Sequence, residues 1–243
     1  MSKEIKVGVI GCGAIGRQHI ARLMNTIPET RVVAVADYYQ PSAQEVAEQY
    51  GITCCATGEE LIALPEVDAV LVTSADPSHA GYVLECIKAG KFVFCEKPLA
   101  DTVEKCKEAE AIIAAHPELT FMLGFMRRYD HSYQVAKKKM ENGDIGDVIL
   151  VRCYSQDPIS IIEGTLEYAP RSGGQFIDMS IHDFDLIRWL TGSEVKELWA
   201  TGGCYEFKQY KNWDDGDNVS GLMKMENDAM AFFFAGRAAA HGS

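Results

Sequence analysis

The chain has 243 residues, of which 47% are apolar and 24% are charged, and its formal net charge is −12. These fractions are ordinary for a globular protein and exclude a disordered, collagen-like or low-complexity chain. An acidic protein repels nucleic-acid phosphates and anionic lipid, so neither is an expected partner. The longest apolar stretch, 229–235, is far shorter than the about 20 residues that a membrane-spanning helix needs.

The N-terminal residues and the cysteines both indicate a cytoplasmic protein. Glu4 and Lys6 stand where a signal peptide would begin its apolar core, and no small-residue cleavage site follows. None of the eight cysteines forms a C-x-x-C pair. This spacing predicts reduced, buried thiols and neither a zinc site nor a disulfide framework, so no metal site is expected.

Up to residue 123, short apolar runs alternate with helical patterns. Such runs are typical of strands buried on both faces of a parallel sheet, and the alternation predicts right-handed βαβ units. We therefore expect an α/β fold, with a doubly wound parallel sheet of the Rossmann type in a domain of residues 1–123. The expected strands are 5–10, 32–36, 69–72, 92–95 and 120–123, and the expected helices are 14–24, 42–50, 78–89 and 103–115.

After residue 123 the pattern changes. The sequence predicts an α+β domain of residues 124–243 whose sheet is mainly antiparallel, with Asn227 and Asp228 in the turn before the last strand. The expected helices are 131–142 and 175–190, the expected strands are 148–156, 195–205, 217–225 and 229–237, and 157–174 is expected to be irregular.

A glycine motif follows the first predicted strand. Gly11, Gly13 and Gly16 fit the G-x-G-x-x-G pattern, which allows a tight turn and a close approach of backbone to a pyrophosphate. Asp37 ends the second predicted strand, where a carboxylate bonds the adenosine ribose. No basic residue follows directly, so the sequence predicts NAD in preference to NADP. The alternative is a glycine turn and a surface aspartate without a ligand.

Glu96 and Lys97 follow the fourth predicted strand, and Pro98 stops it. Ligands in open α/β sheets bind outside the carboxyl ends of strands, which makes this pair a candidate site. An exposed ion pair at a turn is the alternative.

Asp178 and His182 are four residues apart in the predicted helix 175–190, so their side chains should meet. A carboxylate fixes the tautomer of an imidazole and stabilises its charged form, as a general base requires. Asp185 and Trp189 extend the same stripe, which we expect to line a cleft. The alternative is a helix acid beside a core histidine with satisfied hydrogen bonds.

Taken together, these motifs resemble the Gfo/Idh/MocA family, which contains glucose–fructose oxidoreductases and inositol dehydrogenases. They occur in the order found in the family and span nearly the whole chain. The matching segments are 11–16 with Gln18 and His19, then Asp37, 73–79, 96–98, 124–130 and 173–185 followed by 188–190. The segments 125–130 and 178–183 look most like those of inositol 2-dehydrogenases.

The resemblance implies an NAD-dependent dehydrogenase that oxidises a secondary alcohol of a cyclic polyol or sugar, above all inositol to the 2-keto inositol. It assigns Lys97, Asp178 and His182 to catalysis. It places Gly11, Gly13, Ala14, Ile15, Asp37, Ser74, His79, Glu96, Lys97 and Arg127 near the dinucleotide. For His79 a purely structural position at a helix start is the alternative.

Other functions stay open at this point. The substrate could instead be an aldose or amino-sugar derivative, or the chain could be a non-catalytic dinucleotide-binding regulator or subunit of the same fold. A metal hydrolase with ligands from 182–185 lacks a supporting cluster of histidines or cysteines. Compared with the family, the sequence ends early, soon after the strand 229–237. We therefore expect an incomplete second domain that self-associates through its sheet or is less stable.

Overall fold

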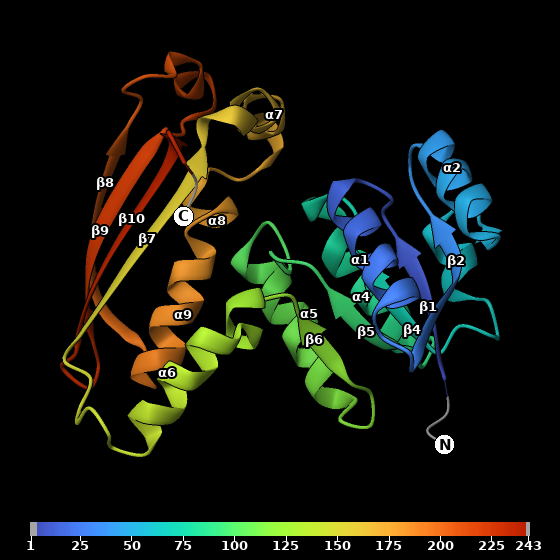
Figure 1. Ribbon diagram of the computed structural model, residues 1–243, viewed down its shortest axis with the longest axis horizontal. Coiled ribbons are helices and arrows are strands. Elements are labelled where there is room, and N and C mark those ends of the chain that lie inside the picture. Colours follow the sequence, from blue (N-terminus) through green and yellow to red (C-terminus); the bar gives the residue numbers. More distant parts are fainter. Residues whose placement is uncertain (1–3, 242–243) are drawn as a thin grey trace. The chain divides into compact units, whose positions relative to one another are not determined.

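The computed structural model describes residues 4–241 and divides into two compact units, Met1–Gly124 and Phe125–Ser243 (Figure 1). The first unit holds a six-stranded sheet of order β3-β2-β1-β4-β5-β6, and every strand pair in it is parallel. This is the strand order of a dinucleotide-binding Rossmann sheet. The strands are β1 (Ile5–Ile10), β2 (Thr30–Ala36), β3 (Thr53–Cys54), β4 (Ala69–Val72), β5 (Phe92–Cys95) and β6 (Phe121–Leu123).

Helices cover both faces of this sheet because its strands are apolar on both sides. Ile20 of α1 and Val46 of α2 belong to one buried apolar cluster, whereas Leu61 of α3 and Val83 of α4 belong to another. The prediction of a doubly wound sheet is therefore confirmed. The helices are α1 (Ala14–Asn25), α2 (Gln40–Tyr50), α3 (Gly58–Ile62), α4 (His79–Lys88) and α5 (Val103–Ala115), with a 3-10 turn, η1 (Asp76–Ser78), before α4.

Two short elements of the first unit were absent from the sequence prediction. Strand β3 contains two residues and α3 contains five. Neither is long enough to show a hydrophobic period, so their positions depend on tertiary contacts. Thr57 caps α3 by accepting a hydrogen bond from the Glu60 N–H at 3.2 Å.

The second unit holds a four-stranded sheet of order β7-β10-β9-β8. Strand β10 pairs parallel with β7 and antiparallel with β9, and β9 pairs antiparallel with β8, so the prediction of a mainly antiparallel sheet is confirmed. Asp228, with φ +66°, forms the expected turn before β10. The strands are β7 (Leu150–Pro158), β8 (Val195–Gly203), β9 (Asn218–Met225) and β10 (Met230–Ala239).

One face of this sheet packs against helix α9 (Ile181–Thr191), which lies beside the strands in Figure 1. Leu186 and Ile187 of the helix share an apolar cluster with Phe233 of β10. The remaining helical elements are η2 (Met126–Tyr129), α6 (His131–Glu141), η3 (Ile159–Ile161), α7 (Ile162–Tyr168), η4 (Ala169–Arg171), α8 (Gln175–Asp178) and η5 (Lys208–Trp213). Thus 157–174 is not irregular throughout, because it contains α7.

The prediction of one continuous helix over 175–190 is wrong. The structure has two helices, α8 and α9, with Met179 and Ser180 between them. The Ser180 N–H donates to the carbonyl oxygen of Gln175, five residues back, at 3.0 Å. This wide turn interrupts the regular i→i−4 ladder, and side-chain periodicity cannot reveal it.

Within residues 4–241, no helix is both long enough and apolar enough to cross a membrane.

Candidate active site

The glycine loop between β1 and α1 has the geometry of a phosphate-binding turn. Gly11 has φ +105°, and a Cβ there would overlap the backbone of Thr73 and Ser74. A Cβ on Gly16 would fall on the Gly11 carbonyl oxygen, so both glycines are required by the fold itself. A Cβ on Gly13 would meet open space. Of the three glycines, Gly13 is therefore the one with open space on its Cβ side.

Ala14 and Ile15 form the exposed first turn of α1. The first N–H groups of a helix have no partner within it, and its dipole favours a negative charge there. This end of α1 and the open side of Gly13 together can hold a pyrophosphate.

Asp37 follows β2 and is bound directly to the glycine loop. Its Oδ2 accepts a hydrogen bond from the Cys12 N–H at 2.6 Å, and its Oδ1 accepts one from the Tyr39 N–H at 2.7 Å. A carboxylate has about four acceptor positions, so capacity for ribose hydroxyls remains. Burial, followed by the charge of Asp37, raises the pKa of the Cys12 thiol to about 12. Cys12 is therefore an unreactive thiol within the loop.

Arg17 is a cation close to this loop that the sequence analysis overlooked. Its Nε donates to the Cys12 carbonyl oxygen at 2.9 Å, and its Nη2 donates to Ser42 Oγ at 3.0 Å and to Glu45 Oε2 at 2.7 Å. The guanidinium is thus anchored at three points and paired with a carboxylate. The sequence signal was present, since Arg17 directly follows Gly16, but its side-chain partners Ser42 and Glu45 are 25 and 28 residues away.

Ser74 and His79 lie at the carboxyl end of β4. The hydroxyl oxygens of Ser74 and Ser78 are 2.7 Å apart. The His79 side chain is buried, with Nδ1 2.7 Å from the Pro98 carbonyl oxygen and Nε2 2.9 Å from that of Ser74. His79 therefore ties the loop after β4 to the loop after β5, as its structural alternative expects. A contact of His79 with the cofactor stays a prediction.

Glu96 and Lys97 follow β5 at the same edge of the sheet, and both are half-buried. Glu96 Oε1 lies 2.9 Å from His19 Nε2 of α1, and Glu96 Oε2 accepts the Lys97 N–H at 3.3 Å. Burial raises the pKa of the Glu96 carboxyl, but the hydrogen bond and charge of His19, with the Lys97 N–H, outweigh it and lower that pKa. Glu96 is therefore a carboxylate that fixes the backbone in front of Lys97.

Arg127 belongs to η2 in the second unit, and its guanidinium is held inside that unit. Nη1 donates to Asp183 Oδ1, and Nη2 donates to Ser155 Oγ at 2.6 Å. Ser155 in turn donates to Asp183 at 2.8 Å, and both residues are buried. This network joins η2 and β7 to α9 next to His182. A contact of Arg127 with a dinucleotide stays a prediction.

Asp178 ends α8 and His182 lies in the first turn of α9, both half-buried. Since the helix is interrupted between them, helical geometry alone does not orient one side chain against the other. The expected polar stripe does not extend further along α9. Asp185 is 5% exposed and makes a two-pronged ion pair with Arg128, with distances of 2.8 and 2.6 Å, and Trp189 packs against the apolar core.

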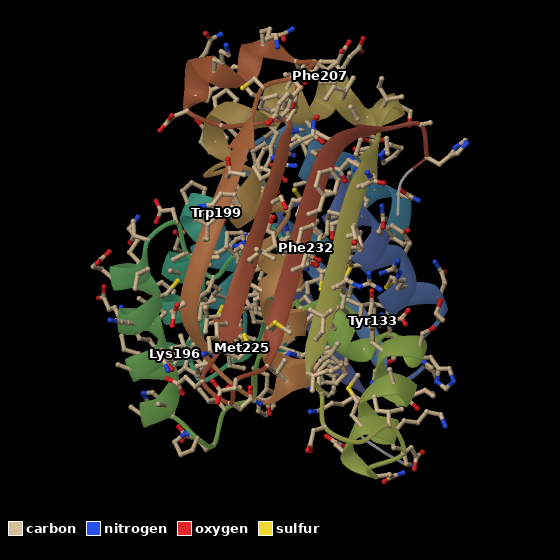
Figure 2. All side chains as sticks on the ribbon, turned by 90° about the vertical axis from the view of Figure 1, so that its left-hand side faces the viewer. Tyr133, Lys196, Trp199, Phe207, Met225 and Phe232 are labelled. Carbon is tan, nitrogen blue, oxygen red and sulfur yellow. The ribbon has the colours of Figure 1, made fainter. Side chains whose placement is uncertain are left out.

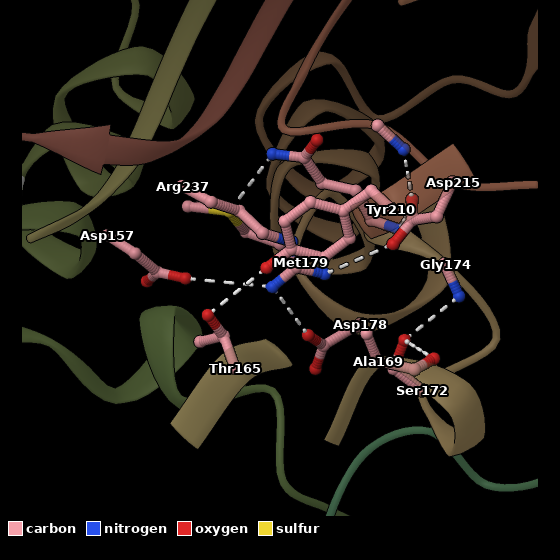
Figure 3. Close-up of polar contacts among 12 residues, drawn as sticks. Asp157, Thr165, Ala169, Ser172, Gly174, Asp178, Met179, Tyr210, Asp215 and Arg237 are labelled. Atoms are coloured by element: carbon pink, nitrogen blue, oxygen red, sulfur yellow. Dashed lines mark hydrogen bonds and ion pairs between the residues drawn. The ribbon is translucent and has the colours of Figure 1, made fainter. Parts of the chain in front are cut away.

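Asp178 also accepts a hydrogen bond, at 3.1 Å, from Arg237, which the sequence analysis did not single out. Arg237 lies in β10 among small and apolar residues, so the hydrophobic pattern of the strand does not mark it as a functional residue. Its importance emerges only from the tertiary structure (Figure 3). His19, Ser155 and Asp183 were likewise not assigned to the site.

Residues 4–241 contain no group of three or more histidine, cysteine, aspartate or glutamate side chains that could hold a metal ion. The first unit therefore presents a phosphate loop, an anchored carboxylate and a lysine at one sheet edge. The second presents an aspartate and a histidine backed by buried charges. These are the groups that a dinucleotide site and a proton-transfer site require.

Family models match both units. Residues 5–125 match the model described as an oxidoreductase family with an NAD-binding Rossmann fold, and residues 133–243 match that of the GFO/IDH/MocA C-terminal domain. Similar proteins include an inositol 2-dehydrogenase of Burkholderia lata, 39% identical over 78% of this chain and 55% of its own length. A myo-inositol 2-dehydrogenase of Thermotoga maritima is 35% identical over 98% of this chain and 70% of its own length.

A solved structure shares the fold of nearly the whole chain. It is scyllo-inositol dehydrogenase from Lactobacillus casei with bound NAD(H) and scyllo-inositol, with a TM-score of 0.93 and 34% identity over 98% of this chain and 71% of that one. The chain thus spans between about half and seven tenths of the length of these relatives. On these matches and the geometry of its glycine loop, the chain belongs to the Gfo/Idh/MocA family of NAD-binding oxidoreductases.

Proposed function

We propose that this chain carries the NAD-dependent oxidation of a secondary alcohol of inositol to a ketone. The observation that carries the proposal is a match over nearly the whole chain to a dehydrogenase solved with NAD(H) and scyllo-inositol. The open glycine loop of the first unit and the half-buried Asp178 and His182 of the second unit support the proposal. Because the chain spans only part of its relatives, the complete reaction is a proposal for this protein.

The residues of the first unit fit NAD. Gly13 offers open space beside the N-terminus of α1 for the pyrophosphate, and Asp37 offers carboxylate oxygens for the ribose. Ser74, Glu96 and Lys97 line the same edge of the sheet, where ligands bind in doubly wound folds. When bound, NAD supplies the acceptor for the hydride that leaves the alcohol carbon.

The chain's own residues would position the alcohol and manage its proton. His182 takes the hydroxyl proton, and Asp178 orients the imidazole and stabilises its charged form. Lys97 donates a hydrogen bond to the reacting oxygen. In this assignment residues 1–123 bind the cofactor and contribute Lys97, and residues 124–243 bind the substrate.

The decisive experiment is the formation of NADH from NAD with a panel of inositols, aldoses and amino sugars. Turnover of myo- or scyllo-inositol above the other compounds supports the proposal. Faster turnover of an aldose or amino sugar would assign that compound as the substrate in place of inositol. NAD binding without any turnover would favour a regulator or subunit of the same fold. A cytoplasmic location stays a prediction from the sequence.

We also propose that a second copy of the chain is a partner, through the outer face of the second unit's sheet. Trp199 and Leu222 are 63% and 55% exposed and stand side by side in the register of β8 and β9, with Phe232 next in β10. Figure 2 shows Trp199 and Phe232 on this face. A contiguous apolar patch of this kind is typical of an association surface.

Light scattering after size-exclusion chromatography would test the association. A dimer or larger species that Trp199→Ser reduces to a monomer supports it, and a monomeric unaltered chain contradicts it.

A further inference from the structure

Arg237 is the largest fully buried side chain in the described part of the protein, with 1% of the residue exposed. A buried cation is costly unless it is paired and hydrogen-bonded. Three carboxylates from different elements surround it (Figure 3). They are Asp178 at the end of α8, at 3.1 Å, Asp157 in β7, at 3.8 Å, and Asp215 after η5, at 3.9 Å.

The three carboxylates are not equivalent. Asp178 alone is within hydrogen-bond distance, since its Oδ2 accepts from Nη1 of Arg237. The Nε and Nη2 atoms of Arg237 are buried and have no hydrogen-bond partner within residues 4–241. The hydrogen bonding of the guanidinium is therefore directed at Asp178, while Asp157 and Asp215 contribute charge at longer range.

Arg237 is itself held firmly. Its N–H donates to the Asp217 carbonyl oxygen at 2.9 Å, and its guanidinium lies over the Tyr210 ring, 5.4 Å from the centroid. Tyr210 is completely buried and donates to Thr165 at 3.2 Å. A cation fixed in this way sets the position of the carboxylate bound to it, because the carboxylate is the more exposed partner, at 19% against 2%.

The interrupted helix makes such an anchor necessary. In a continuous helix, the i and i+4 spacing would align Asp178 with His182. Here the wide turn at Ser180 separates α8 from α9, so an external contact must fix the direction of Asp178. Arg237 supplies that contact from β10.

We propose that Arg237 is a positioning residue: it fixes the Asp178 carboxylate, which in turn holds the His182 imidazole in place for proton transfer. The inference rests on the proposed function. If Arg237 acts through Asp178, removing it from a protein that already lacks the carboxylate changes little. If Arg237 only stabilises the fold, removing it changes turnover equally in the unaltered protein and in the protein that lacks the Asp178 carboxylate, or changes it in neither.

The test is a double-mutant cycle of Arg237→Met and Asp178→Asn, with kcat and KM measured for inositol oxidation. We expect each single variant to lower kcat by about 10- to 100-fold, and the double variant to lie within about threefold of Asp178→Asn. NAD affinity, a property of the first unit, stays unchanged. Multiplied losses in the double variant, or full kcat in Arg237→Met, would overturn the inference.

Two further variants separate positioning from folding. Arg237→Lys keeps the charge without the planar fork, and we expect it to recover part of the lost kcat. Asp217→Asn is the matched structural control, because its buried carboxylate accepts three backbone N–H groups of the loop after β8. The substitution keeps the backbone carbonyl that accepts the Arg237 N–H. It should lower the thermal unfolding temperature and leave kcat of the folded protein intact. Equal kcat losses in Asp217→Asn and Arg237→Met contradict a positioning role.

A second readout does not need turnover. The imidazole ¹⁵N resonances of His182 should move in Arg237→Met, and should not move further when this change is added to Asp178→Asn. Absence of turnover with every polyol and sugar would overturn the proposed function, whereas this NMR cycle still decides the coupling. Resonances that stay in place in Arg237→Met would overturn the inference alone.

Discussion

The glycine loop of the first unit and the Asp178–Arg237 pair of the second unit both hold groups of the proposed site in place, but by different means. The loop presents binding groups through its backbone, and the residues that shape it, 11–16, are contiguous. Asp178 and Arg237 are 59 residues apart and depend on α8, β10 and the loop after η5. The turn itself is formed by glycines that are close in sequence, although Asp37 and Thr73 pack against it. The buried charge cluster depends on every element that contributes to it.

The largest expected effect belongs to the second region and tests its role in chemistry. His182→Ala should lower kcat by about 10²–10⁴-fold, as the loss of a general base does, and leave NAD affinity nearly unchanged. Steady-state kinetics and NAD titration would measure the two effects. Full activity of the alanine variant would contradict a role of His182 as general base. Arg188→Met is the control in the second unit, because this variant loses an exposed ion pair with Glu194.

The glycine loop allows a matched pair of substitutions that separates its fold from its ligand. Gly11→Ala places a side chain at φ +105° against the backbone of Thr73, so we expect roughly 1–3 kcal/mol or more of destabilisation. Gly13→Ala has open space and φ −71°, so stability should persist. NAD affinity should nevertheless fall, because the methyl group occupies the pyrophosphate side.

Urea unfolding and NAD titration of both variants provide the measurement. If Gly13→Ala bound NAD as tightly as the unaltered chain, the ligand would not approach the loop at Gly13.

The first region was largely predictable from sequence because its causes are local. The spacing of Gly11, Gly13 and Gly16, the apolar run before them and the acid at Asp37 all lie on a short piece of chain. The alternating apolar runs also gave the parallel sheet, since strand burial shows in composition. What sequence missed there, such as the Arg17–Glu45 pair, joins residues whose proximity only the fold creates.

The support of the second region could not be predicted from the sequence. The spacing of Asp178 and His182 suggested neighbours on one continuous helix, and the structure interrupts that helix between them. The break at Ser180 depends on a single displaced backbone hydrogen bond, which leaves the hydrophobic period nearly unchanged. Arg237 lies 59 residues from Asp178, and no pattern in the sequence connects them.

The cofactor preference tests whether Asp37 acts as a ligand group as well as part of the loop. Asp37→Ala removes a charged acceptor that contributes about 1.5–3 kcal/mol per hydrogen bond, so NAD affinity should fall by roughly 10- to 100-fold. The preference over NADP should narrow, because the carboxylate no longer repels a 2′-phosphate. Tighter binding of NADP than NAD by the unaltered chain would contradict this role.

Glu45→Gln extends this comparison. It frees Arg17, 2.7 Å from Glu45, from its carboxylate partner. We expect a small gain in NADP affinity with no change for NAD, measured by the same titration. No gain would mean that Arg17 does not reach the phosphate.

The smallest expected effect concerns the pH dependence of the first unit, through Glu96. Burial raises the pKa of its carboxyl, but His19 and the Lys97 N–H lower that pKa by more than burial raises it. The pKa in the folded protein therefore lies below the ordinary glutamate value. The unfolded chain therefore binds the proton more readily, and the stabilisation is fully present above the ordinary pKa. It is lost as the pH falls from that value through the lowered one. Glu96→Gln should cost on the order of 1 kcal/mol at neutral pH and should flatten the acid limb of stability. Urea unfolding at stepped pH measures both, with the exposed Glu45→Gln as control, and an unchanged acid limb in Glu96→Gln would show that the His19–Glu96 pair contributes nothing to stability.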